Sequence, residues 1–215
     1  MNKNKPYRVI ISLLIVFISP FVHADETLIK EKETPIINNE KKVFNPLGES
    51  ISIKLIDHEM LNAKRERVQL VKDVMGDKLV IMNFIYTDCK TVCPVSTHIM
   101  SEVYKKIQAN EDNKTKVKLI TLTLNPKVDT PKKMQEFSEK YAKSGSEWAW
   151  LTGSSTKVNE ALLGLRAYAP VVSEHSSVIL VGDPKDNHWT GFYQFPKPDN
   201  IVERVYEYIE KRQAK

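Results

Sequence analysis

Apolar and polar residues change period several times along the chain, and these changes predict strands that alternate with helices. Residues 78–86 and 117–124 are nearly continuous apolar runs, the pattern of central strands that are buried on both faces. Residues 51–55 alternate apolar and polar side chains, as a half-buried strand does. Three shorter strands are expected at residues 148–151, 177–181 and 189–195, and the last two predict a hairpin.

Helical periods fill the segments between these strands. Residues 95–107 carry apolar side chains four positions apart, which places them on one face of a helix. Thr130-Pro131 predicts a helix start, because proline is tolerated at the first helical position. The expected helices cover residues 95–107, 130–143, 155–165 and 199–212. The element order βαβαβαββα predicts an α/β fold, a central mixed sheet flanked by helices on both faces.

The first 24 residues have the pattern of a signal peptide. Lys3, Lys5 and Arg8 precede an apolar run, and Val22-His23-Ala24 resembles a processing site. The run contains two serines and a proline and is shorter than the about 20 apolar residues of a membrane span, so cleavage is favoured over an uncleaved anchor. We therefore expect a periplasmic or otherwise extracytoplasmic protein, with anchoring to the inner membrane as the alternative.

Composition and charge exclude several classes of protein. Hydrophobic residues make up 41% of the chain and charged residues 27%, which is ordinary for a globular domain. The formal net charge of +5 includes the three cations of the signal segment, so the remainder lacks the clustered basic face of a nucleic-acid-binding protein. Residues 25–43 are polar and predict a flexible leader ahead of one domain over residues 44–215.

Cys89 and Cys93, the two cysteines of the chain, follow the strand 78–86 where the next helix begins. Functional groups collect outside the carboxyl ends of strands in open α/β sheets, and a helix N-terminus lowers a thiol pKa. On a helix this spacing separates Cβ atoms by about 5–6 Å, whereas a disulfide needs about 3.5–4.5 Å. A disulfide therefore requires Cys89 to lie in the loop before the helix or a distorted first turn. A disulfide between the two cysteines and a metal ion bound by both thiolates therefore remain alternatives, and the spacing favours the metal ion.

Copper is the metal that best suits two thiolates. Soft sulfur ligands select Cu(I) and can hold zinc, but structural zinc needs four closely spaced N or S ligands. Two sulfurs and one imidazole suffice for copper. His175 is the favoured imidazole, because the loop that enters the strand 177–181 packs against the cysteine loop in a thioredoxin-like sheet; an exposed loop histidine is the alternative. Weaker candidates are His58, His98 and His188, and Met82 and Met100 are expected to fill the core.

The sequence around these residues resembles the Sco/SenC family of thioredoxin-like copper proteins. Phe84-Ile-Tyr-Thr-Asp-Cys-Lys-Thr-Val-Cys-Pro94 is similar to the family's strand, threonine and CxxxCP pair. His175-Ser176 matches the start of its histidine-bearing strand. Further similar motifs are Thr123-Leu-Asn-Pro126, Asp129-Thr-Pro131 and Trp150-Leu-Thr-Gly153. The resemblance extends over about residues 44–212 and implies a thioredoxin-like fold.

The resemblance also implies a copper metallochaperone. Such a domain would bind one copper ion through Cys89, Cys93 and His175 and deliver copper, or reducing equivalents, to the binuclear copper centre of a respiratory oxidase. Its partners would be the copper-accepting oxidase subunit and thiol reductants, with membrane association through the N-terminal segment. The chain departs from the family pattern at Thr91 and Asn125, where aspartates are usual, and this puts the partner rather than the ligand set in question.

Two other functions compete with the metallochaperone. An extracytoplasmic thiol–disulfide oxidoreductase needs Cys89 and Cys93 but not His175. A peroxiredoxin-like peroxidase would use Thr87, two positions before Cys89, yet the chain shows neither the PxxxTxxC context nor an evident arginine partner.

Overall fold

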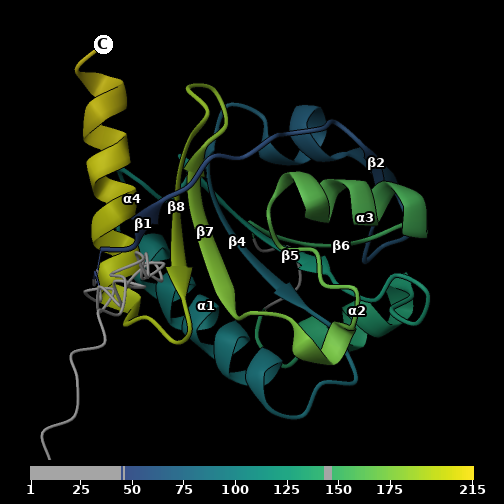
Figure 1. Cartoon of the computed structure of the whole chain (residues 1–215). Helices are drawn as coiled ribbons and strands as arrows, with labels where there is room; N and C mark the ends of the chain where they lie inside the picture. The colour runs from purple at the N-terminus through teal and green to yellow at the C-terminus, as the bar shows by residue number, and fades with distance from the viewer. Residues whose placement is uncertain (1–44, 46, 143–146) are drawn as a thin grey trace, which may run out of the picture. The chain divides into compact units, whose positions relative to one another are not determined.

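The computed structural model describes residues 45, 47–142 and 147–215 (Figure 1). Within them, one eight-stranded mixed sheet has the strand order β1-β8-β7-β4-β5-β6-β2-β3. The strands are β1 Glu49–Ser50, β2 Glu59–Asn62, β3 Arg67–Gln69, β4 Leu79–Ile85, β5 Val117–Thr123, β6 Trp148–Thr152, β7 Val178–Asp183 and β8 His188–Tyr193. Strands β4, β5 and β6 run parallel, whereas β7 pairs antiparallel with both β4 and β8.

Helices cover both faces of this sheet, as the element order predicts. They are the π-helix η1 Leu70–Met75, α1 Val92–Gln108, α2 Pro131–Ser138, α3 Ser155–Gly164, the 3-10 helix η2 Val172–Glu174 and α4 Pro198–Gln213. Alternate residues of β4 belong to two hydrophobic clusters, so Ile81 packs with α1, α2 and α4, whereas Met82 packs with η1 and α3. The α/β architecture is therefore confirmed.

The expected strand at residues 51–55 is wrong, because only β1 pairs with β8 at this edge. The apolar side chain of Ile53 is buried, but the Lys54 N–H donates to the Gly164 carbonyl at the end of α3, 3.0 Å away. A Cβ atom at Gly164 would lie 2.1 Å from the Lys54 carbonyl oxygen, so the close approach requires glycine. The alternating pattern thus marks an irregular segment packed on a helix end.

Several unpredicted elements and two helix boundaries also differ from the sequence-based expectation. The antiparallel pair β2–β3 and the helix η1 were not predicted. Helix α1 begins at Val92 and includes Cys93, and α2 ends at Ser138, before the predicted residue 143. The predicted signal peptide and leader lie outside the described residues. In the part of the chain that the structure describes, every helix is too short or too polar to cross a membrane.

Candidate metal centre

The two cysteines lie at the carboxyl end of β4, in the position that the sequence predicts. Cys89 occupies the loop after the strand and Cys93 is the second residue of α1. The Cys93 backbone N–H donates to Cys89 Sγ at 3.4 Å, because the loop turns the first sulfur towards the unpaired amides of the helix start. Both thiols are free, with 4% and 0% of Cys89 and Cys93 exposed. Cys89 thus lies before the helix, which is one of the arrangements that a disulfide requires.

His175 follows η2 and enters β7, whose first residues lie beside the end of β4. Its Nε2 atom lies 3.9 Å from Cys93 Sγ, although the two residues are 82 positions apart. Its Nδ1 atom lies 2.9 Å from the Val172 carbonyl oxygen. A carbonyl can only accept, so Nδ1–H donates and Nε2 presents a lone pair towards the thiol. The Tyr86 ring packs against the imidazole at 5.7 Å and holds its plane.

The two thiols and the imidazole are ligands of the type that a thiophilic metal ion prefers, and the distance between one pair of donor atoms can be compared with that in a metal site. Metal–sulfur and metal–nitrogen bonds of about 2.3 and 2.0 Å place the two donor atoms about 3.5–3.8 Å apart. The separation of 3.9 Å between Cys93 Sγ and His175 Nε2 is slightly longer than this range. Among the described residues, however, no three His, Cys, Asp or Glu side chains already form a closed metal cluster. The described geometry therefore brings one sulfur and one imidazole nitrogen together, with the second thiol beside them.

The two thiols differ in acidity. Burial acts to raise the pKa of Cys89, but hydrogen bonds from the Cys93 and Thr91 amides, the Cys93 thiol and the Tyr86 hydroxyl outweigh it and lower this pKa to about 7. Burial raises the pKa of Cys93 far above its usual range, and the negative charges of Cys89 and Asp129 add to the effect. Cys89 is therefore the thiol that ionises first.

The other candidate residues lie elsewhere. His98 is exposed on α1, and His58 Nε2 lies 2.9 Å from the Glu160 carboxylate. His188 begins β8 at the opposite end of the sheet, where its ring packs against Tyr208 at 5.3 Å. Met82 and Met100 are fully buried in the core, as expected.

Comparison with known proteins identifies the chain. It matches the SCO1/SenC family over residues 56–210, most of its length. The chain belongs to the SCO1/SenC family. The SCO1 protein homolog of Bacillus subtilis (strain 168) is 29% identical over 131 residues, which cover 60% of this chain and 62% of that relative. The aligned part is thus less than two thirds of the relative's length.

Solved structures of Sco proteins share this fold. BsSco, described as a member of the Sco family of cytochrome c oxidase assembly proteins with a disulfide switch, has a TM-score of 0.63 and 23% identity, covering 74% of this chain and 95% of that one. Arabidopsis thaliana ScoI with copper bound has a TM-score of 0.61 and 19% identity, covering 77% of this chain and 99% of that one. The thioredoxin-like fold is therefore confirmed.

Sequence reasoning missed the side chains that support the site of this SCO1/SenC protein. Asp129, quoted only as part of a helix-start motif, is a buried carboxylate bonded to Thr87 and Thr123. Tyr86, quoted only as the end of a strand, packs its ring against His175, and its hydroxyl helps to lower the pKa of Cys89. One signal was available for Asp129, since it directly precedes Thr130, which already supplies the helix cap.

Proposed function

We propose that this SCO1/SenC protein is a copper metallochaperone. It takes one copper ion on Cys89, Cys93 and His175 and serves assembly of the binuclear copper centre of a respiratory cytochrome oxidase. The observation that carries the proposal is the approach of the His175 Nε2 atom to within 3.9 Å of the Cys93 sulfur, beside a second thiol. Copper-bound structures of Sco proteins from Arabidopsis thaliana and yeast support the choice of metal.

The donor set suits a protein that accepts copper and releases it again. Two thiolates hold Cu(I), and the imidazole adds the nitrogen ligand that Cu(II) favours. The ligand thiols must lose their protons, so copper uptake releases protons from Cys93 in particular. Three ligands from loops and a helix end leave room for an incoming donor from an acceptor protein. Copper is thus cargo rather than a resident cofactor.

The proposal includes a compartment and partners. The protein would act in the periplasm, or elsewhere outside the cytoplasm, and its N-terminal segment would be cleaved or would anchor it to the inner membrane. The copper-accepting oxidase subunit would receive the metal, and thiol reductants would keep Cys89 and Cys93 reduced between cycles, because a disulfide removes both thiolates.

Copper titration of the reduced protein under anaerobic conditions tests the proposal. We expect one copper ion per chain, and the His175→Ala variant should lose Cu(II) binding strongly and Cu(I) binding less, because two thiolates remain. His98→Ala removes an exposed histidine from α1 and is the matched control, which should bind copper like the wild type. A wild-type protein with both thiols free that takes up no copper would overturn the proposal.

The second candidate function is a thiol–disulfide oxidoreductase, favoured by two neighbouring thiols of unequal acidity, with Cys89 Sγ accepting from the Cys93 backbone N–H. The Cys89 thiolate would attack a partner's disulfide and release one partner thiolate. Cys93 would then displace the second, so that the partner gains two electrons and the Cys89–Cys93 disulfide forms, to be reduced again by a thiol reductant. If His175→Ala binds both copper states like the wild type while reductase activity persists, this second function is correct.

A further inference from the structure

Asp129 lies where three neighbouring parallel strands end, and its side chain is only 1% exposed. Its Oδ1 atom accepts from the Thr87 backbone N–H at 3.1 Å and from the Thr87 hydroxyl at 2.5 Å. Its Oδ2 atom accepts from the hydroxyl of Thr123, the last residue of β5, at 2.5 Å. The hydroxyl of Thr152, at the end of β6, donates to the Asp129 backbone carbonyl at 2.6 Å. One residue thereby joins the ends of β4, β5 and β6.

These bonds are stronger than ordinary neutral ones. Hydroxyl donors at 2.5 Å from a carboxylate oxygen have the length of charge-assisted hydrogen bonds. A buried carboxylate without these donors would be strongly destabilised by desolvation, so the hydrogen bonds to Asp129 are expected to persist in the folded protein. Thr87 stands two residues before Cys89, and the Cys89 N–H donates to the Tyr86 carbonyl at 3.1 Å. Asp129 therefore restrains the backbone of the loop that carries Cys89, through its hydrogen bonds to Thr87.

We propose that Asp129 is a positioning residue for the cysteine pair. Through Thr87 it fixes the loop that presents Cys89 to Cys93 and His175, without itself being a metal ligand. The inference rests on the proposed function for its copper readout, whereas its disulfide readout needs no copper. Removing the carboxylate should loosen the loop, lower the effective concentration of Cys89 at Cys93 and weaken copper binding.

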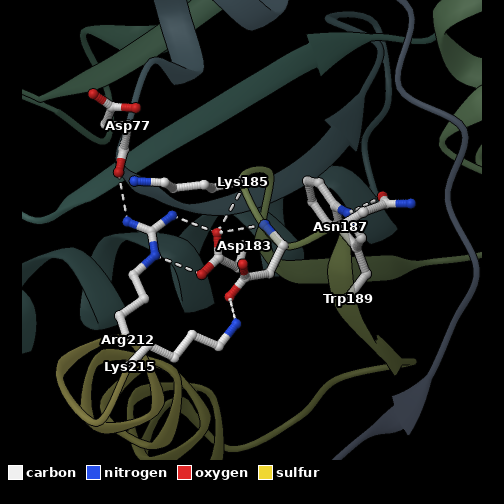
Figure 2. Close-up of polar contacts among 8 residues, drawn as sticks. Asp77, Asp183, Lys185, Asn187, Trp189, Arg212 and Lys215 are labelled. Carbon is white, nitrogen blue, oxygen red and sulfur yellow. Dashed lines mark hydrogen bonds and ion pairs between the residues drawn. The ribbon is translucent and has the colours of Figure 1, made fainter.

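Asp183 provides a matched control, because it is a second buried aspartate with an equally dense set of partners. It is 4% exposed, and Figure 2 shows its carboxylate held by the Arg212 guanidinium and by the Lys185 backbone N–H. Arg212 also donates to the Asp77 carbonyl, so the group joins the end of α4 both to the β7–β8 hairpin and to the turn before β4 (Figure 2). Asp183 pairs with His188 beside the start of β4, at the opposite end of the sheet from the cysteines.

The experiment compares wild type, Asp129→Asn, Thr87→Val, their double variant and Asp183→Asn. Three quantities are measured on each: the Cys89–Cys93 disulfide equilibrium in a copper-free glutathione buffer, Cu(I) affinity by competition with a chelator, and Tm. We expect Asp129→Asn to disfavour the disulfide about tenfold, or about 30 mV. Loss of a residue that supports metal ligands should weaken copper binding about 10–100-fold. Thr87→Val should act in the same direction.

The double variant should be little worse than Asp129→Asn alone, because both changes break the same contact. Asp183→Asn should lower Tm and leave the disulfide equilibrium and the copper affinity unchanged. If Asp129→Asn lowers Tm while both constants stay within about twofold of the wild type, Asp129 is merely structural and the proposal is wrong. Fully additive effects of the two substitutions would refute the route through Thr87.

Two outcomes separate this proposal from the proposed function. If Asp129→Asn does not fold, Thr87→Val, which leaves the carboxylate with two of its three donors, decides the question by the same criteria. If the wild type binds no copper, the metallochaperone function fails, and the disulfide equilibrium alone confirms or refutes the positioning role.

Discussion

Replacing Tyr86 with phenylalanine should raise the pH at which Cys89 becomes reactive. Burial acts to raise the pKa of Cys89, and hydrogen bonds from two amides, the Cys93 thiol and the Tyr86 hydroxyl overcome it to bring the value to about 7. The same contact raises the pKa of Tyr86, whose hydroxyl is better held as a donor beside a thiolate. Tyr86→Phe removes this donor and leaves the ring beside His175.

The pH profile of thiol modification measures this effect. A thiol with a pKa of about 7 is half ionised at pH 7, so the copper-free, reduced protein should react with a small aromatic disulfide at about half its alkaline plateau rate. A cysteine with the ordinary pKa of about 8.5 would reach about 3% of its plateau at that pH. Burial slows the absolute rate of Cys89 at every pH and cancels in this ratio.

Two variants make the assay decisive. Tyr86→Phe should move the midpoint of the profile to higher pH, whereas Tyr206→Phe on α4 should leave it in place. A wild-type midpoint at about pH 8.5 or above would refute the lowered pKa of Cys89. An unchanged midpoint in Tyr86→Phe would show that the two backbone amides and the Cys93 thiol stabilise the Cys89 thiolate without the Tyr86 hydroxyl.

Three further predictions follow from the same structure. Oxidation to the Cys89–Cys93 disulfide should abolish copper uptake, because it removes both thiolate ligands; copper bound with unchanged spectra after verified oxidation would place the site elsewhere. Burial opposes ionisation of Asp183, but Arg212 outweighs it and lowers the pKa of this carboxyl. Its stabilisation is therefore present above the unfolded-state pKa of about 3.9 and lost as the pH falls below it. The Tm difference between wild type and Asp183→Asn should become smaller at acid pH. A difference that stays constant with pH would show that ionised Asp183 does not stabilise the folded protein. Exported protein should begin at Asp25, and a mass that includes Met1 would instead indicate an uncleaved anchor.

The sequence predicted the central elements because their signals are local. The runs 78–86 and 117–124 are apolar at almost every position, and both are buried strands, β4 and β5, within a residue or two of the expected ends. The loop after β4 was located by the same run, since the chain turns polar where the strand ends. His175 was a candidate because it stands just before the expected strand 177–181, and the structure places its Nε2 atom 3.9 Å from Cys93 Sγ.

The parts that failed depend on contacts between distant residues. β2 and β3 contain four and three residues and include several charged or amide side chains, so no apolar period marks them. The segment 51–55 alternates like a strand, but its backbone pairs with the end of α3. The position of Asp129 before the Thr130 cap is visible in the sequence, but its hydrogen bonds to Thr87 and Thr123 form only when the ends of β4 and β5 meet.

The antiparallel pairing of β7 with β4 sets the order in which the donors can assemble during folding. Cys89 and Cys93 lie within one turn of chain, whereas His175 reaches them only after a segment of 82 residues has been closed. Closing such a loop costs conformational entropy that local contacts do not, so the sulfur pair forms early and the imidazole arrives late. A chain that bound copper before β7 had paired with β4 would bind it through the two sulfur atoms alone. The proposed three-donor site would therefore be complete only in the folded chain.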